Sequence, residues 1–151
     1  MSDLFKDKGL SQIEISQAFI AIEDRFLMQL RDFNPSIVYP GHWGFFAGHS
    51  EPGESAEECM WREIEEELCW KPQNLNFLGS LMVEGNRRIH AYQCRLNGEL
   101  ETLTLQEGQE IGAFTTEEIT QNSLFSQKWL QHYPISPISA KVFQHFMGIQ
   151  T

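Results

Sequence analysis

The sequence has few of the features that attach a chain to a membrane or brace it with disulfides. Its uninterrupted apolar stretches are only a few residues long, whereas a helix that spans a membrane needs about 20. Charges occupy the segment from Met1 to Lys8, where an export signal would be apolar, so we expect no export signal. The three cysteines include no Cys-x-x-Cys pair, which argues against a disulfide framework or a zinc site. A reducing, cytoplasmic location is therefore expected.

Basic residues are also scarce, with 11 lysines and arginines against 21 acids and a formal net charge of −10. An acidic chain repels the phosphate backbone, so duplex nucleic acid is not expected as a partner. No internal repeat, low-complexity tract or Gly/Ser-rich linker divides the 151 residues. This length suits one domain, residues 1–151. Whether two copies associate as a homodimer stays open.

Short β-compatible runs alternate with a few helical segments. Strands are expected at 18–22, 26–30, 43–47, 77–84, 88–96, 99–105 and 111–114. Helices are expected to begin at Ser55, Thr116 and Ser136, and tight turns are expected at 23–25 and 85–86. Such a mixture predicts an α/β fold of the mixed α+β kind, with a mixed sheet between helices instead of a regular βαβ repeat.

The clearest helix opens with a capping box made by Ser55 and Glu58 and ends before a proline. An apolar stripe recurs every four residues along it, at Ala56, Met60, Ile64 and Leu68. Beside the stripe, Glu63, Glu66 and Glu67 stand at i, i+3 and i+4, so they share one face of the helix. Convergent carboxylates are hard oxygen ligands that suit Mg²⁺ or Mn²⁺. A solvated acidic helix face is the alternative interpretation.

The loop and the helix together resemble the Nudix box, Gly-x5-Glu-x7-Arg-Glu-U-x-Glu-Glu-x-Gly-U, where U is a bulky aliphatic residue. The matching residues stand at the required spacing: Gly48, Glu54, Arg62, Glu63, Ile64, Glu66 and Glu67. Trp43 before the box and the run 51–55 within it are similar to the family as well. Two positions depart from the pattern, because Cys69 replaces glycine and Trp70 replaces an aliphatic residue. That glycine closes the helix, often with a positive φ, so cysteine there is expected to cost about 1 kcal/mol or to shift the helix end.

The resemblance implies a Nudix-like α/β/α sandwich around a mixed β-sheet, with a metal-dependent site. The ligands of Mg²⁺ or Mn²⁺ would be the carbonyl of Ala47, the carboxylates of Glu63, Glu66 and Glu67, and a later acid, assigned to Glu110 with Glu107 as the other candidate. The catalytic set would be Glu63, Glu66, Arg62 and Glu54. In that set Arg62 and Glu54 would clasp the loop to the helix, and Glu66 or Glu63 would act as general base.

The activity that the resemblance implies is that of a metal-dependent pyrophosphohydrolase, which cleaves a nucleoside diphosphate linked to another moiety. The substrate would be a small-molecule nucleotide. No signature of an ADP-ribose, NADH or coenzyme A hydrolase is present, so a MutT-like nucleoside triphosphate is the default. A nucleotide-sugar hydrolase and a non-catalytic nucleotide-binding regulator of the same family are the alternatives. An isomerase of the isopentenyl diphosphate type is disfavoured, because such enzymes have a degenerate box.

Three residues outside the box are assigned to substrate binding. Arg87 and Arg88 follow the 85–86 turn and would contact phosphates, although a solvated turn is the alternative. Trp43 would stack on a base, with packing in the core as the alternative. His42 and His49 flank the loop and are interpreted as structural or solvated residues.

Overall fold

The computed structural model describes residues 12–148. Its strands are β1 (Ile13–Ile22), β2 (Arg25–Leu30), β3 (Trp43–Gly44), β4 (Phe46–His49), β5 (Asn76–Val83), β6 (Arg87–Arg95), β7 (Glu110–Thr115), β8 (Ser123–Ser126) and β9 (Gln131–Pro134). Its helices are α1 (Ala56–Leu68), α2 (Thr116–Thr120), α3 (Pro137–Met147) and the short 3₁₀ turn η1 (Leu100–Thr102). The expectation made for Met1 to Lys8 lies outside the described residues. Within 12–148, no helix is long and apolar enough to cross a membrane.

Strand β1 is the centre of a seven-stranded mixed sheet. One edge of β1 pairs in parallel with β6 from Ile13 to Ala21. Its other edge pairs antiparallel, first with β4 and then, at the end of the strand, with β2. Strand β5 lies outside β6, while β3 and β7 pair with β2. Because β1 is paired on both edges and covered on both faces, its segment 16–21 is buried throughout, as in other central strands.

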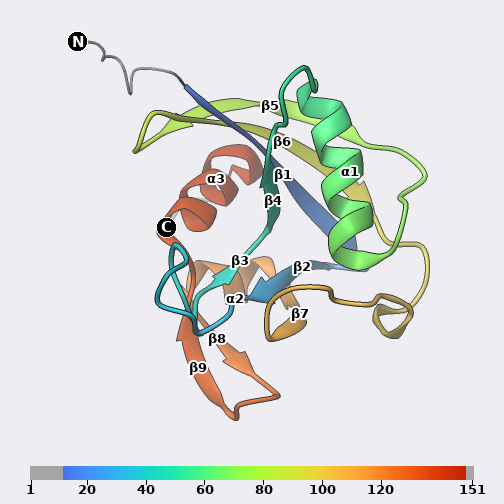
Figure 1. Cartoon of the computed structure of the whole chain (residues 1–151). Coiled ribbons are helices and arrows are strands. Elements are labelled where there is room, and N and C mark those ends of the chain that lie inside the picture. Colours follow the sequence, from blue (N-terminus) through green and yellow to red (C-terminus); the bar gives the residue numbers. More distant parts are fainter. Residues whose placement is uncertain (1–11, 149–151) are drawn as a thin grey trace.

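Two apolar clusters cover the two faces of this sheet. The cluster beneath α1 includes Ala18, Ile20, Phe46, Met60, Ile64 and Leu68. The cluster beneath α3 includes Phe19, Trp43, Phe45, Val142 and Phe143. Successive residues of a strand point to opposite faces, which is why neighbours in β1 belong to different clusters. Helices α1 and α3 lie on opposite sides of β1 and β6, so the expected α/β/α sandwich is confirmed (Figure 1).

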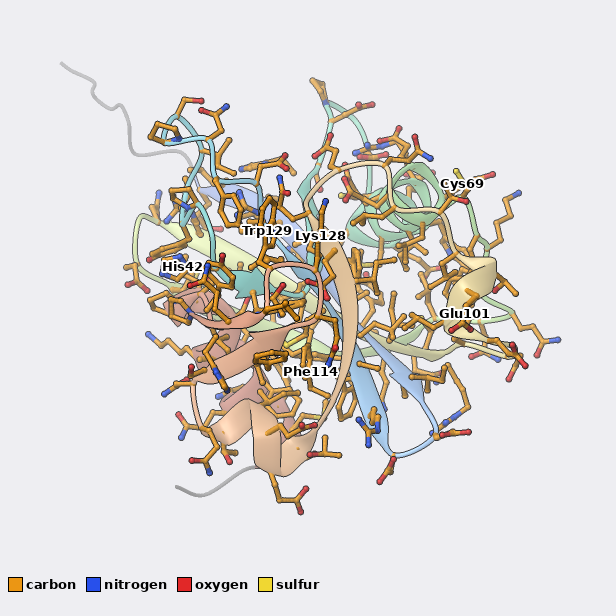
Figure 2. All side chains as sticks on the ribbon, turned by 90° about the horizontal axis from the view of Figure 1, so that it is seen from below. His42, Cys69, Glu101, Phe114, Lys128 and Trp129 are labelled. Carbon is orange, nitrogen blue, oxygen red and sulfur yellow. The ribbon has the colours of Figure 1, made fainter. Side chains whose placement is uncertain are left out.

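Helix α1 begins and ends as its sequence predicts. The Ser55 hydroxyl accepts the N–H of Glu58 at 3.1 Å, and the Glu58 carboxylate accepts the N–H of Ser55 at 2.9 Å. The stripe residues Met60, Ile64 and Leu68 are fully buried. At the far end, labelled in Figure 2, Cys69 adopts a left-handed conformation with φ 52° and closes the helix. The positive φ expected at this position is therefore present.

The strand expected at 99–105 is wrong. Residues 100–102 form the turn η1, in which the N–H and the hydroxyl of Thr102 both donate to the Glu99 carbonyl, and residues 103–105 are not in a strand. The next backbone N–H groups are used by α1, because Thr104 and Gln106 donate to the carbonyls of Leu68 and Glu67. Local and helix-end partners thus satisfy the hydrogen-bonding groups that a sheet would have taken.

The hairpin of β8 and β9 was not expected from the sequence. Each strand has four residues, and the tip between them carries Lys128 and Trp129, which lie side by side in Figure 2. Strands of four residues offer too short a window for a periodic apolar pattern, and in β8 one of the two buried positions is the polar Ser126. The expected strand at 43–47 is also divided, into β3 and β4, with Phe45 between them.

Candidate functional site

Arg62 fastens the loop 48–54 to the side of α1. Its Nε and Nη2 donate to the two carboxylate oxygens of Glu54 at 2.7 and 2.9 Å, and Nη2 also donates to the His49 carbonyl at 3.1 Å. Two parallel bonds to one carboxylate form a fork that the planar guanidinium holds rigidly. The Arg62 bonds, followed by the N–H of Glu51, lower the pKa of Glu54 to about 2. The structure therefore brings Arg62 and Glu54 together as expected.

Gly48 leaves the space in which the Glu63 side chain lies. A Cβ at this position would stand 2.1 Å from Cδ of Glu63 and 2.5 Å from its Oε1. No side chain larger than hydrogen fits there while Glu63 keeps its place. The glycine of the box thus has a steric role, which is to let a carboxylate from α1 reach the backbone of β4.

The remaining nitrogen of Arg62 lies between two of the helix carboxylates. Its Nη1 donates to Oε2 of Glu63 at 2.8 Å and to Oε1 of Glu66 at 3.2 Å. Burial raises the pKa of Glu63, and the bond from Arg62 opposes that rise. Glu66 is more open to solvent, with 59 % of its side chain exposed, whereas the figure for Glu63 is 15 %. Both carboxylates therefore converge on one cationic group.

Glu67 has a different environment from these two. Its Oε1 is buried and has no hydrogen-bond partner. Burial raises the pKa of Glu67 to about 7, and repulsion from Glu107, Glu63 and Glu66 adds to the rise. A carboxylate that is buried, unpaired and surrounded by other acids is unfavourable unless a proton or a cation compensates its charge.

The later acid that reaches this cluster is Glu107. Its charge acts on both Glu63 and Glu67. The segment before it is fixed by its hydrogen bonds to the end of α1, which explains the placement. Glu110, the residue assigned from the sequence, directs its carboxylate elsewhere, since it accepts the Ser126 hydroxyl at 2.6 Å and the Gln127 N–H at 3.0 Å. Glu110 thus contacts the β8–β9 hairpin, whereas Glu107, the other candidate from the sequence, is the later acid whose charge acts on the α1 carboxylates.

The chemistry of this donor set fits a divalent cation. Within residues 12–148, no three side chains of His, Cys, Asp or Glu are already close enough together to enclose an ion. The orphaned Glu67 oxygen nevertheless lies among Glu63, Glu66 and Glu107, and Arg62 is the cation that contacts two of these acids. Carboxylate oxygens of this kind are the ligands that Mg²⁺ and Mn²⁺ prefer.

A cavity of about 260 Å³ lies on the α3 side of the sheet. Its walls come from β1, β3, β4, β6, the loop 31–42 and the start of α3. Ala47 and His49 of β4 line it, while Gly48 between them meets Glu63 on the α1 side. Strand β4 therefore lies between the cavity and the carboxylates, and Gly48 both lines the cavity and faces Glu63.

Of the three residues assigned to substrate binding, the structure brings only Arg87 to this cavity. Arg88 follows it in β6 and points to the other face, where its Nε donates to the Gln12 side chain. Trp43 has no exposed surface, and its indole N–H donates to the Leu124 carbonyl at 3.0 Å. Stacking of Trp43 on a base is therefore wrong, and core packing is its role.

Two residues at the cavity were missed from the sequence. Gln17 lies in its wall with 3 % of its surface exposed, and Arg31 lines it from the end of β2. A detectable signal existed for Gln17, because it is a polar residue directly before the apolar run 18–22 of the same strand. Nothing in the local pattern marks Arg31, since its place depends on the path of the loop 31–42.

A family model described as the NUDIX domain matches residues 16–145. Among curated proteins, the NAD-capped RNA hydrolase NudC of Pseudomonas putida (strain GB-1) is 48 % identical over 66 residues, which are 44 % of this chain and 24 % of that protein. The same enzyme from Pseudomonas syringae pv. tomato (strain DC3000) gives 48 % over 66 residues, or 23 % of its length. The chain thus spans about a quarter of the length of these relatives.

Solved structures extend the likeness over almost the whole chain. The ORF135 protein of E. coli is 26 % identical, with a TM-score of 0.66 and coverage of 91 % of this chain and 90 % of the other. The MutT protein of Methanosarcina mazei Go1 is 21 % identical, with a TM-score of 0.69 and coverage of 91 % and 94 %. The second likeness shows the shared fold.

Proposed function

Because the chain belongs to the NUDIX domain family, we propose that it is a metal-dependent pyrophosphohydrolase. It cleaves a phosphoanhydride bond in a nucleoside diphosphate that is linked to another moiety. Members of this family are Nudix hydrolases, and the curated relatives are hydrolases as well.

The observation that carries the proposal is the environment of Glu67. Its buried oxygen has no partner, and its pKa is raised to about 7 next to three further acids. A fold gains nothing from such an arrangement, so a ligand of opposite charge is its simplest explanation. A non-catalytic regulator would have no need to keep this set intact, which favours the enzyme over that alternative.

Each residue of the box then has a distinct task. Glu63, Glu66, Glu67 and Glu107, with the Ala47 carbonyl, would hold Mg²⁺ or Mn²⁺. A bound divalent cation shields the charge of the pyrophosphate and lowers the pKa of a water molecule that it binds. Glu66 or Glu63 takes the proton from the attacking water as general base. Arg62 and Glu54 are positioning residues, since their fork fixes the loop that carries Ala47 and Gly48.

The default substrate is a nucleoside triphosphate of the MutT type. The cavity of about 260 Å³ is at the small end of ligand pockets, so it suits one ring system better than both halves of a dinucleotide. The NudC relatives act on NAD-capped RNA, and this makes a dinucleotide cap the first alternative to test. A nucleotide sugar is the second.

The free thiols of Cys59, Cys69 and Cys94 fit the expected cytoplasmic location.

A screen of nucleotides tests the proposal. Nucleoside triphosphates, nucleotide sugars, ADP-ribose and NAD are incubated with the protein and Mg²⁺, Mn²⁺ or EDTA, and released phosphate, pyrophosphate and nucleoside monophosphate are measured. We expect at least one compound to be cleaved at a phosphoanhydride bond with a metal and not with EDTA. Cleavage that survives EDTA would contradict metal dependence, and no cleavage of any compound would contradict the activity.

A further inference from the structure

The cavity on the α3 side holds a buried polar group that no part of the protein satisfies. Nε2 of Gln17 is buried and has no hydrogen-bond partner, although Gln17 is 3 % exposed and lies in the cavity wall. Gln17 is paired with Ala47 of β4 on one side and with Ala91 of β6 on the other. Both side chains are small, so they leave the space next to the Gln17 side chain open. A valine or isoleucine would suit this central strand better, because burying an unpaired amide is unfavourable.

The other walls restrict what could pair with this amide. Ile15, Phe45, Ile89 and Ile138 give the cavity apolar walls, and Tyr39, His49, Ser136 and Ser139 add polar groups elsewhere in its lining. A sugar ring carries hydroxyl groups around its edge and on both faces, and those turned toward the apolar walls would have no partners. A purely apolar ligand would leave the Gln17 amide unpaired. A planar ring with apolar faces and one polar edge satisfies both conditions, and a nucleobase is such a ring.

The position of the cavity agrees with this ligand. Ala47 and Gly48, in β4, connect the cavity wall to the Glu63 side chain on the other face. Arg31 and Arg87 also line the cavity, and both are cations suited to phosphate oxygens. A nucleotide with its base in the cavity could therefore direct its phosphates past β4 toward the carboxylates.

We propose that Gln17 is a specificity-determining residue that reads the hydrogen-bonding edge of the substrate's nucleobase in this cavity. The proposal deepens the proposed function and rests on it for the identity of the reacting end of the substrate. The amide donates through Nε2 to an acceptor on the base edge, or accepts through Oε1 if it is rotated by half a turn. Either orientation distinguishes bases that differ in the order of donors and acceptors.

Binding without turnover tests this inference. AMP, GMP, CMP, UMP and the base-free ribose 5-phosphate are titrated calorimetrically in EDTA against the wild-type protein, Gln17→Leu and Gln17→Met. The matched control is Gln93→Leu, which changes a glutamine of the neighbouring strand β6 that does not line the cavity. We expect the wild type to bind at least one monophosphate about tenfold more tightly than ribose 5-phosphate, as one buried hydrogen bond would allow.

Both Gln17 variants should lose most of the preference among bases, while Gln93→Leu keeps it. Their melting temperatures should not fall, because an unpaired polar group has been removed. Equal binding of all five compounds, no binding at all, or an unchanged base preference in both Gln17 variants would overturn the proposal. This assay involves neither a metal nor hydrolysis. A failed nucleotide screen would therefore contradict the hydrolase activity without contradicting base recognition by Gln17. Failure of the binding assay would contradict base recognition without contradicting the activity.

Discussion

The two faces of the sheet contribute to the site in opposite ways. The carboxylates on the α1 side come from one continuous segment, 48–67, with Glu107 as the single distant addition. The cavity on the α3 side takes residues from β1, β4, β6, a loop and a helix start, between Ile13 and Ser139. The side chains of a site on one helix recur with the period of that helix, so the site can be predicted from a short stretch of sequence. A cavity formed by many distant segments exists only after the chain has folded.

The largest expected effect separates two adjacent glutamates of α1. Glu66→Gln should lower kcat/KM at least about a hundredfold, because loss of a partner that merely supports a metal ligand already costs 10- to 100-fold. Glu65 is exposed and has no assigned partner at the site, so Glu65→Gln should change kcat/KM little. The measurement is steady-state kinetics on the nucleotide that the screen identifies, with circular dichroism as the folding control.

Equal losses in the two variants would mean that the total charge of the helix matters and the particular face does not. If both variants kept the wild-type kcat/KM, Glu66 would not belong to the metal centre. Either outcome would mean that the acidic face of α1 has no special role compared with the rest of the helix.

The next effect in size concerns Gly48, where the two faces meet. Gly48→Ala should lower kcat/KM by about tenfold or more, because its Cβ would displace the Glu63 carboxylate from β4. The Glu63 side chain is flexible at its end, so the fold should survive and the melting temperature should change by only a few degrees. Full activity with a normal melting temperature would show that the observed place of Glu63 is not needed.

A third prediction uses the pKa of Glu67, raised from 4.5 to about 7. An acid with a raised folded-state pKa holds its proton more tightly in the native state, so its contribution to stability is present below 4.5 and lost as pH rises through about 7. A cation competes with that proton. The rise in melting temperature caused by Mg²⁺ should therefore be small at about pH 5.5 and larger at about pH 8.

Thermal-shift titrations at the two pH values check this, with Glu67→Gln as the comparison. The variant has no carboxylate to titrate at this position, so both the gain in melting temperature and its dependence on pH should shrink. A pH dependence that is the same in the variant and the wild type would assign it to another group.

The smallest effect is expected at the end of α1. Cys69 has φ 52°, which a side chain with a Cβ adopts at a cost, so Cys69→Gly should stabilise the protein by about 0.5–1 kcal/mol and raise the melting temperature by about 1–4 °C. Asn122, with φ 62°, offers a matched control. Asparagine tolerates this conformation, so Asn122→Gly should gain less. A larger gain at Asn122 would show that backbone strain does not limit the helix end.

Much of the fold was predictable because its signals are local. The capping box, the apolar stripe and the positive φ at Cys69 each depend on residues within one helix. The strand expected at 99–105 failed because hydrogen bonds to the distant end of α1 replaced a sheet ladder. The β8–β9 hairpin was not predicted because its strands have only four residues each, and one of the two buried positions of β8 is the polar Ser126.

The site residues likewise include some that local sequence predicts and some that only the folded chain brings together. Arg62, Glu54 and Glu63 lie where the motif predicts, since a helix and its preceding loop set their positions. Glu107 and Glu110 could not be separated from the sequence, because only the path of the chain after η1 decides which of them faces α1. Gln17 precedes the apolar run 18–22 in the sequence, but the open space next to it depends on its pairing partners Ala47 and Ala91, which only the folded sheet brings beside it.

The most direct measurement is an anomalous difference map from a crystal of this protein soaked in Mn²⁺. A cation bound by the carboxylates of α1 should give the strongest peak within about 2.0–2.6 Å of the Glu67 carboxylate, with oxygens of Glu63 or Glu66 also in contact. The peak should be absent from crystals of Glu67→Gln soaked in the same way. A strongest peak away from α1, or one that persists unchanged in the variant, would contradict a metal centre at this site.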